Sequence, residues 1–422
     1  MREMKFSGVE WIGDIPKEWE TKSIRSMLIE RNEKNRQLSI KTILSLSAKD
    51  GVTLYNSETH SGNKPKEDLS DYKIVRINDI VINSMNILSG SVGLSKYEGV
   101  VSPVYYIYYP RKEDNTDYLH MIFQCFEFQR SLRGLGNGIL IKETESGALN
   151  TIRMRIPAKK LALQEFPCPP VSEQNAIAGF LRIKYMQIDS LIANAEQQIA
   201  KLKAYKQSVI TETLSPNDSW HRCKLGFIAS FKNGLNYNGT ITDENIKFLG
   251  VGDFQDNFII DDENMLSTLL FDGSVPQDLL LQNGDIVFVR SNGSKELVGR
   301  SVLLENITFP LTFSGFCIRM RNKRTDLVLN KFLLYSFWSS RFRQTLNQES
   351  KGFNINNLNQ GILSKFLVYY PDTQRQKEII EILDTKRSQI DRLITLKQQK
   401  IEKLQQYKKS IIYEYVTGKK EV

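Results

Sequence analysis

The C-terminal part of this chain repeats, without a gap, a segment that lies 202 residues earlier. When Gln174–Glu212 is placed over Gln376–Glu414, 18 of the 39 aligned pairs are identical, including the Ile-Asp pairs at 188–189 and 390–391. Identity at this level over an unbroken stretch indicates a duplicated structural unit, and such a repeat constrains the fold more than a local motif does. A chain of 422 residues is long enough to hold two units of this kind.

Both copies are predicted to be long helices. Neither contains proline, and Gly179 is the only glycine in either window, so few residues oppose helix formation. Apolar residues recur at steps of four and three, which is the heptad pattern of helices that pack along a seam. At about 1.5 Å per residue, a helix of this length extends for roughly 58 Å and is therefore also a spacer. The residues predicted for the helix seam or for subunit docking are Ile188, Leu191, Leu202, Tyr205, Ile390, Leu393, Leu404 and Tyr407.

Proline-bearing sequence precedes each predicted helix, FPCPPVSEQ in the first copy and YYPDTQRQ in the second. A proline is tolerated at a helix start but not in its interior. Ser172, and either Asp372 or Thr373, are predicted N-caps because their side-chain oxygens can accept a hydrogen bond from a free helix N–H. The helices should therefore begin close to these residues.

The segments before the helices repeat more weakly. Trp19 corresponds to Trp220, and INDIVINSMN at 77–86 resembles NGDIVFVRSN at 283–292. Runs of β-branched and aromatic residues bounded by turn residues predict strands. We therefore expect an α+β fold with a pseudo-two-fold internal repeat, in which two globular domains are separated by two long antiparallel helices that form a coiled coil. The predicted boundaries are 1–170 and 216–371 for the globular domains, and 171–215 and 372–422 for the helices.

Composition narrows the environment and the partner. The formal net charge of +9 favours a polyanionic partner, nucleic acid before membrane. The sequence has no apolar run of the roughly 20 residues that cross a bilayer, and no secretory signal at its start. The four cysteines are scattered without a CxxC pair, which fits a reducing cytoplasm better than a disulfide or zinc framework.

Motifs for chemistry are not found in the sequence. There is no Walker A loop and no Asn/Asp-Pro-Pro-aromatic motif of the kind amino-methyltransferases use. The glycines in RGLGNGIL form only GxGxG, which is typical of a turn. The three histidines, His60, His120 and His221, include no pair at metal-ligand spacing. We therefore expect no catalytic residue and no metal ligand on this chain.

With its repeat and its flanking motifs, the sequence resembles the specificity subunit of type I restriction-modification systems. The resemblance covers essentially the whole chain and rests on the opening GVEWIGDIPKEWE, the junctions PPVSEQ and PDTQRQ, the segment GDIVFVRS and the helix ending YKKSIIYEYVTGK. It implies that each globular domain is a target recognition domain that reads one half of a split, asymmetric sequence in double-stranded DNA. It also implies that the helices set the gap between the halves and that the chain itself is non-catalytic.

The resemblance further implies a set of protein partners. Two methyltransferase (modification) subunits would dock on the helices, and a restriction subunit with translocase and nuclease activity would join them. The methyltransferase would use S-adenosylmethionine, and no cofactor is expected on this chain. Two other functions stay open from the sequence: the recognition subunit of a combined type II restriction-methylation system, and a coiled-coil scaffold whose globular domains bind proteins instead of DNA.

Residues that reach DNA base edges are chiefly Arg, Lys, Asn and Gln, whereas phosphates are contacted mainly by basic and small polar groups. Two loops at matching positions of the repeat meet this need, each after a DIV segment, although an ordinary polar hairpin tip explains them too. A second pair of segments follows a later helical stretch, and could equally be connectors. The predicted DNA-binding residues are Asn83, Ser84, Asn86, Arg130, Arg133 and Lys142 in the first domain, and Arg290, Ser291, Asn292, Lys295, Arg341, Arg343, Lys351, Asn354 and Asn356, with Asn357 beside them, in the second.

The second predicted helix is rich in lysine, with Lys397, Lys400, Lys403, Lys408 and Lys409 set against Glu402. Such a face could lie along the duplex between the half-sites and add salt-dependent affinity without sequence information. A solvated helix face explains the same charges equally well.

Overall fold

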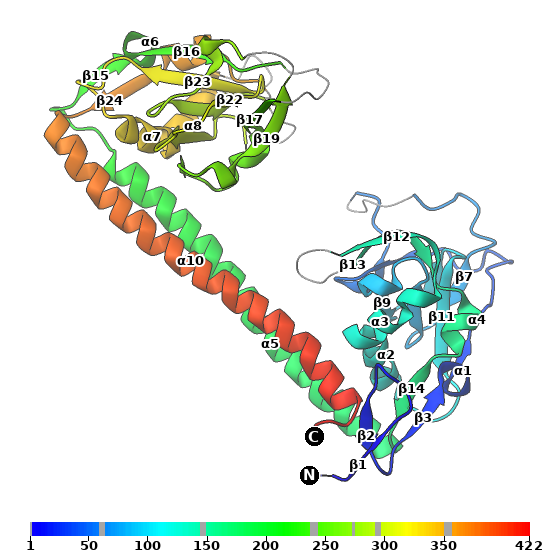
Figure 1. Ribbon diagram of the computed structural model, residues 1–422. Coiled ribbons are helices and arrows are strands. Elements are labelled where there is room, and N and C mark those ends of the chain that lie inside the picture. The colour runs from blue at the N-terminus through cyan, green and yellow to red at the C-terminus, as the bar shows by residue number, and fades with distance from the viewer. Residues whose placement is uncertain are drawn as a thin grey trace. The chain divides into compact units, whose positions relative to one another are not determined.

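A computed structural model of the chain describes residues 2–58, 64–143, 149–236, 244–271, 275–291, 297–349 and 357–422. The chain forms two compact units, which are described separately: Met1–Ala195 together with Gln399–Val422, and Glu196–Gln398. Two long helices, α5 (Val171–Thr213) and α10 (Thr373–Val416), each contribute one part to each unit (Figure 1). The two helices predicted from the repeat are thus present.

The first unit is an α+β domain built around the antiparallel sheet β4-β11-β8-β9. The smaller sheets are β1-β2, β3-β14, β5-β6, β7-β10 and β12-β13. Its elements, in chain order, are β1 (Met4–Phe6), β2 (Asp14–Pro16), β3 (Glu20–Ser23), α1 (Ile24–Met27), β4 (Leu28–Glu30), β5 (Leu44–Ser47), β6 (Gly51–Leu54), β7 (Lys73–Val75), β8 (Ile80–Asn83), η1 (Ile87–Ser89), β9 (Val92–Leu94), β10 (Gly99–Val101), β11 (Tyr105–Pro110), α2 (Thr116–Gln124), α3 (Phe126–Ser131), η2 (Leu132–Leu135), β12 (Asn137–Glu143), β13 (Leu149–Arg155), α4 (Ala158–Ala162) and β14 (Glu165–Cys168).

The second unit contains the related sheet β16-β23-β20-β21-β18, with β19-β17-β22 and β15-β24 beside it. Its elements are β15 (His221–Lys224), α6 (Leu225–Ile228), β16 (Ala229–Asn233), β17 (Glu244–Leu249), η3 (Val251–Asp253), β18 (Ile259–Ile260), η4 (Glu263–Met265), β19 (Ser267–Phe271), η5 (Gln277–Leu279), β20 (Ile286–Val289), β21 (Ser301–Leu304), β22 (Leu311–Phe313), β23 (Cys317–Asn322), α7 (Asn330–Trp338), α8 (Ser340–Glu349), α9 (Gln360–Lys365) and β24 (Leu367–Tyr370).

The strand order demonstrates the repeat that the globular sequences showed only faintly. The order β4-β11-β8-β9 in the first unit corresponds to β16-β23-β20-β21 in the second, and β3-β14 corresponds to β15-β24. A buried aspartate precedes the central strand in both units. Asp79 accepts two hydrogen bonds from Arg31, and Asp285 accepts two from Arg321. The arginine lies just after β4 in the first unit but on β23 in the second. The two equivalent aspartates are therefore paired with arginines from different parts of the fold.

The ends of the long helices complete the core of each unit. In the first, Ile177 and Leu181 of α5 lie in one hydrophobic cluster with Ile411 and Val416 of α10. In the second, Ile210 of α5 and Ile379 and Leu383 of α10 belong to the core of the second globular domain. The hydrophobic core of each globular domain is therefore completed by residues of both helices.

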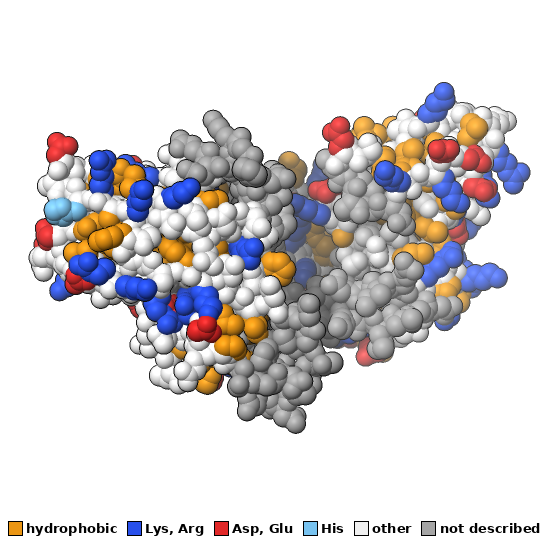
Figure 2. All heavy atoms as spheres, turned by 90° about the horizontal axis from the view of Figure 1, so that it is seen from above, with side chains coloured by type: hydrophobic (Ala, Val, Ile, Leu, Met, Phe, Trp, Pro, Cys, Tyr) orange, Lys and Arg blue, Asp and Glu red, His pale blue; other side chains and the backbone are white. Residues whose placement is uncertain are grey.

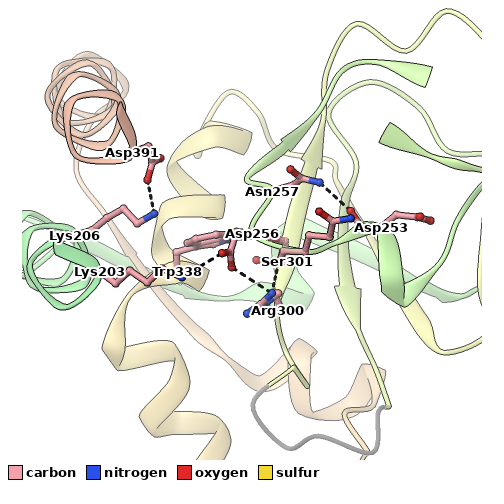
Figure 3. Close-up of polar contacts among 10 residues, drawn as sticks. Lys203, Lys206, Asp253, Asp256, Asn257, Arg300, Ser301, Trp338 and Asp391 are labelled. Carbon is pink, nitrogen blue, oxygen red and sulfur yellow. Dashed lines mark hydrogen bonds and ion pairs between the residues drawn. The ribbon is translucent and has the colours of Figure 1, made fainter. Parts of the chain in front are cut away.

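Within each unit the two helices run antiparallel and are linked by equivalent ion pairs. Lys408 lies 2.6 Å from Asp189 in the first unit, and Lys206 lies 2.7 Å from Asp391 in the second (Figure 3). Both lysines and both aspartates differ in number by 202, so the offset read from the sequence reappears as matching contacts. The internal repeat is thus expressed in equivalent side-chain contacts within each unit.

The seam between the helices is narrower than the heptad pattern predicts. Ile188 and Ile390 are buried, and Leu202 and Leu404 are half-buried. The other four predicted seam residues are 44–53% exposed, so they do not line the contact between α5 and α10; they are Leu191, Tyr205, Leu393 and Tyr407. A pair of helices covers only one stripe of each partner, which leaves a second apolar stripe facing outward.

The helix starts agree with the sequence at one junction and differ at the other. Asp372 is the N-cap of α10, because its Oδ1 accepts a hydrogen bond from the Arg375 N–H at 2.9 Å. Ser172 is not an N-cap: α5 begins at Val171, and the Pro170 carbonyl accepts the N–H groups of Glu173 and Gln174. The proline-rich turn moves the start of the helix forward, so Ser172 lies in the first turn.

A buried glutamine fixes each junction between globular domain and helix. Gln174 donates to the carbonyl of Pro169 and to Asp114, and accepts from the Asn115 N–H. Its counterpart 202 residues later, Gln376, donates to the carbonyls of Pro371 and Leu327 and accepts from the Leu329 N–H. Both side chains are fully buried. These two residues, called here the junction glutamines, satisfy the backbone groups of the loop that precedes α2 or α7.

The end of the chain is built into the first unit. The Lys419 ammonium and the Tyr413 hydroxyl donate to the Ile12 carbonyl, and the Tyr118 hydroxyl donates to the Val416 carbonyl. Gly418 has φ of +70°, and a Cβ there would lie 2.5 Å from the Pro16 ring. Glycine is required at this position both by the backbone conformation and by the close approach of the N-terminal segment.

Candidate nucleic-acid interface

In the second unit, the structure brings together two segments that the sequence predicts to touch DNA. Ser291 forms a β-bridge with Asn357, the Arg290 Nε donates to Asn357 Oδ1 at 3.2 Å, and the Leu358 N–H donates to the Arg290 carbonyl. Arg290 and Ser291, which follow β20, and Asn357, which precedes α9, therefore lie on one surface. Residues 66 positions apart in sequence present their side chains together because backbone bonds join the two loops.

The two arginines of α8 lie on different sides of that helix. The Arg343 Nη1 donates to the Val298 carbonyl at 2.6 Å, so this side chain lies against the far end of the loop after β20. The Arg341 guanidinium lies 4.9 Å from the centre of the Tyr369 ring, near the end of α5. Of the two, Arg343 therefore contacts the segment that leads into β21, whereas Arg341 lies against Tyr369.

In the first unit, the corresponding loop follows β8. Asn83 Oδ1 accepts the Met85 N–H at 3.0 Å and shapes the turn, while Asn86 is exposed. Ser84 corrects our expectation: it is fully buried, and its hydroxyl donates to the Val104 carbonyl at 2.7 Å. Its position on the inner side of the turn makes it a structural residue, because the side chains of a strand alternate between the two faces.

The loop after β8 also lies beside the helical segment that carries the second predicted pair. A Cβ placed on Gly90 would lie 3.6 Å from the Gln129 amide nitrogen of α3. Arg130 is exposed and lies over the Phe126 ring at 5.7 Å, and Arg133 of η2 is half-buried. The first unit thus repeats the arrangement of the second, with a loop after the central strand next to the helix that follows α2 or α7.

Several predicted contacts lie outside the described residues: Asn292, Lys295, Lys351, Asn354 and Asn356. Lys142 lies on β12, whose backbone is described but whose side chains are not. DNA contact by these residues stays a prediction.

The lysines of α10 do not act as one group. Lys408 pairs with Asp189, and the Lys397 ammonium donates to Gln198 Oε1 at 2.6 Å, so both lie against α5. Lys409 lies 5.4 Å from the centre of the Phe126 ring, and Lys400 and Lys403 are exposed. Figure 2 shows that basic side chains are interspersed with acidic ones on the face in view and do not form one continuous patch.

Sequence reasoning missed three charged residues in the second unit. Asp256, in the loop after η3, lies 3.4 Å from the Lys203 ammonium of α5 and 3.7 Å from the Arg300 guanidinium (Figure 3). Arg300 lies at the end of the loop that contains Ser291. A basic residue beside a predicted contact loop could therefore have been predicted from the sequence as a further DNA-binding residue. The proximity of Lys203 and Asp256 could not be predicted from the sequence, because these residues are far apart along the chain.

Burial shifts the pKa of two cysteines and one histidine away from neutral pH. Burial raises the pKa of the Cys125 thiol well above its ordinary range and that of Cys317 to about 12, so neither forms a thiolate at neutral pH. Burial lowers the pKa of His120 to about 4. Within the described part of the chain, no three His, Cys, Asp or Glu side chains are grouped to hold a metal ion.

Comparison with known proteins shows what this chain is similar to. Residues 217–406 match the family described as Type I restriction modification DNA specificity domain. The chain is also similar to specificity subunits of type I restriction enzymes. It is 25% identical over 287 residues to the Type I restriction enzyme StySPI specificity subunit of Salmonella potsdam, over 64% of this chain but only 58% of that protein. It is 23% identical over 365 residues to the MjaVIII specificity subunit of Methanocaldococcus jannaschii, over 82% of this chain and 80% of that protein.

A solved structure confirms the fold over most of the chain. A chain from a study of complex assembly and conformational transition in the type I R-M system aligns with a TM-score of 0.70 at 11% identity, covering 95% of this chain and 98% of that one. The α+β repeat with two long helices is therefore an architecture already known from type I systems. Among the described helices, none is long and apolar enough to span a membrane.

Proposed function

We propose that this chain is the DNA sequence-specificity subunit of a type I restriction-modification complex. The observation that carries the proposal is that each half of the duplicated fold joins a polar loop after its central strand to the helical segment that follows α2 or α7. Two such surfaces, differing in sequence but built on the same strands, suit a split and asymmetric DNA target read as two half-sites. The relatives named as type I specificity subunits support this function.

The helices serve as a spacer and as the docking surface for protein partners. Leu191, Tyr205, Leu393 and Tyr407 are large, exposed and placed equivalently in the two units. Apolar and aromatic groups repeated in this way fit two copies of one partner, each binding one equivalent site. We assign these sites to two methyltransferase subunits, which would use S-adenosylmethionine, and a restriction subunit would join the assembled core.

The chain contributes recognition and no catalysis of its own. Two of its cysteines, Cys125 and Cys317, are buried as thiols, and burial keeps the His120 imidazole neutral at physiological pH. Methylation and cleavage would therefore reside in the partner subunits, directed by where this chain binds.

Exchange of one globular domain tests the function. The full chain with residues 1–170 replaced by the corresponding domain of a second family member is expressed with its methyltransferase, and methylated sites are mapped by sequencing. One half of the methylated sequence should change while the other half and the gap stay the same. An unchanged methylated sequence would refute DNA reading by this domain. Failure of every version to bind DNA, with stable capture of protein partners, would favour a scaffold.

A further inference from the structure

The second unit contains a polar cavity of about 400 Å³ between α5 and the globular domain. Its wall includes Trp338 of α7, Arg343 of α8 and the segment Gly299–Ser301 at the start of β21. Gln207 of α5 closes one side and donates to the Trp338 carbonyl at 2.6 Å. Its volume is within the range of pockets that hold small ligands, about 300–1,000 Å³.

The charges around this cavity are arranged for an anion. Lys203, Arg300 and Arg343 supply positive groups, and Asp256 is the acidic residue of the lining. The Asp256 carboxylate lies between the Lys203 ammonium and the Arg300 guanidinium (Figure 3). The protein's own carboxylate therefore occupies the place that an oxyanion ligand would take.

Two observations favour exchange of the Asp256 carboxylate for a ligand oxyanion. The Asp256 side chain is 76% exposed, and both of its ion pairs are longer than a tight charge-assisted hydrogen bond. In the cavity wall, Ser301 is buried, and its Oγ has no hydrogen-bond partner among the described residues. A buried hydroxyl without a partner is costly, and a ligand oxygen would satisfy it.

We propose that this cavity is a phosphate-binding site, closed by Asp256 in the free protein and opened when a phosphate of the bound duplex replaces that carboxylate. The inference rests on the proposed function and deepens it. Arg300 ends the same loop that begins with Arg290 and Ser291, and Arg343 donates to that loop. The Asp256 carboxylate then competes with DNA phosphates for Lys203 and Arg300 and so weakens phosphate binding. Base contacts made at the target sequence would offset this competition.

The test measures binding of full-length protein to a mixed-sequence duplex as a function of salt. Asp256→Asn removes the carboxylate that pairs with Lys203 and Arg300, so affinity at low salt should rise about threefold to tenfold. The slope of log affinity against log salt should steepen by about 0.9 for one added phosphate contact. Arg300→Gln in the Asp256→Asn background should abolish the gain. Ser301→Ala should reduce affinity while leaving the thermal unfolding temperature unchanged or higher.

Asp261→Asn is the matched control, because Asp261 is an exposed carboxylate in the same domain. An equal gain from Asp261→Asn would show a general charge effect and overturn the proposal. Inorganic phosphate and ATP are tested as competitors. If Asp256→Asn strengthens binding of either one but not of the duplex, the site takes a free ligand and the proposal fails. If the wild-type chain binds no duplex at all, it is the proposed function that fails.

Discussion

The junction glutamines give the sharpest test of how the helices are joined to the globular domains. In Gln376→Leu, the side chain keeps its approximate volume but loses two donated hydrogen bonds of 2.8 Å and one accepted bond of 2.9 Å. Each buried bond contributes about 1 kcal/mol net, and the partners left behind are backbone groups that the fold also buries. We therefore expect the free energy of unfolding to fall by about 2–4 kcal/mol.

Thermal unfolding followed by circular dichroism measures this loss. For a unit of this size, about 1 kcal/mol lowers the midpoint by roughly 2–4 °C, so Gln376→Leu should lower it by roughly 5–15 °C. Gln398→Leu makes the same chemical change at an exposed position of α10 and is the control. Gln174→Leu should act on the first unit by a similar amount, because Gln174 also makes three hydrogen bonds, two of them to backbone groups. A midpoint for Gln376→Leu equal to that of the control would refute the reasoning.

Gln376→Glu separates hydrogen bonding from packing, because it keeps the shape of the side chain. A buried carboxylate facing two carbonyls should have a pKa raised above its ordinary value of about 4.3. Stability relative to wild type should then be best below that pH and be lost as the pH rises and the group ionises. A variant whose stability relative to wild type does not change with pH would show that water reaches the junction.

Three further predictions concern the first unit. Asp79→Asn should lower the free energy of unfolding by about 3 kcal/mol in chemical denaturation, because it leaves the Arg31 guanidinium partly buried without its charge partner; a loss under 1 kcal/mol would contradict this. Burial lowers the pKa of His120 to about 4, so as the pH falls the unfolded chain binds this proton before the folded chain does. The free energy of unfolding should therefore fall by up to about 3 kcal/mol between pH 6.5 and 4. His120→Gln should flatten this part of the stability profile, and an unaltered profile would exclude His120 as the cause of the loss. Ser84→Ala should destabilise the unit by about 1–2 kcal/mol with no change in the DNA sequence read, whereas Asn86→Ala should weaken DNA binding without loss of stability; reversed results would show that the two roles are exchanged.

The sequence predicted only in part which polar residues of the loops support the fold and which are free to contact DNA. The DIV segments located the loops after β8 and β20, because alternating apolar residues before a polar turn are typical of a strand end. Which side chain of the turn faces outward depends on the local twist and on the partner strand. Ser84 therefore was wrongly expected at the DNA surface, and its hydroxyl bonds to Val104, a residue on a different segment.

The two long helices could likewise be predicted only in part. The 202-residue offset predicted two equivalent helices, and this is confirmed by α5 and α10 and by their matching Lys-Asp pairs. The heptad pattern alone could not distinguish an apolar residue in the contact between the helices from one on the outward stripe. Ile188 is buried whereas Leu191, three residues later, is 44% exposed, because two helices cover only one stripe of each other.

The sequence by itself determined that the chain is a duplicated α+β unit with two long helices, because repeat, periodicity and turn residues are local or depend only on counting positions. Only the tertiary structure decided which distant residues meet. The approach of Asp256 to Lys203 and Arg300, the bridge from Ser291 to Asn357 and the junction glutamines all join segments that no local pattern relates. Contacts of this kind depend on how the loops pack against α5 and α10, and packing is set by the whole fold.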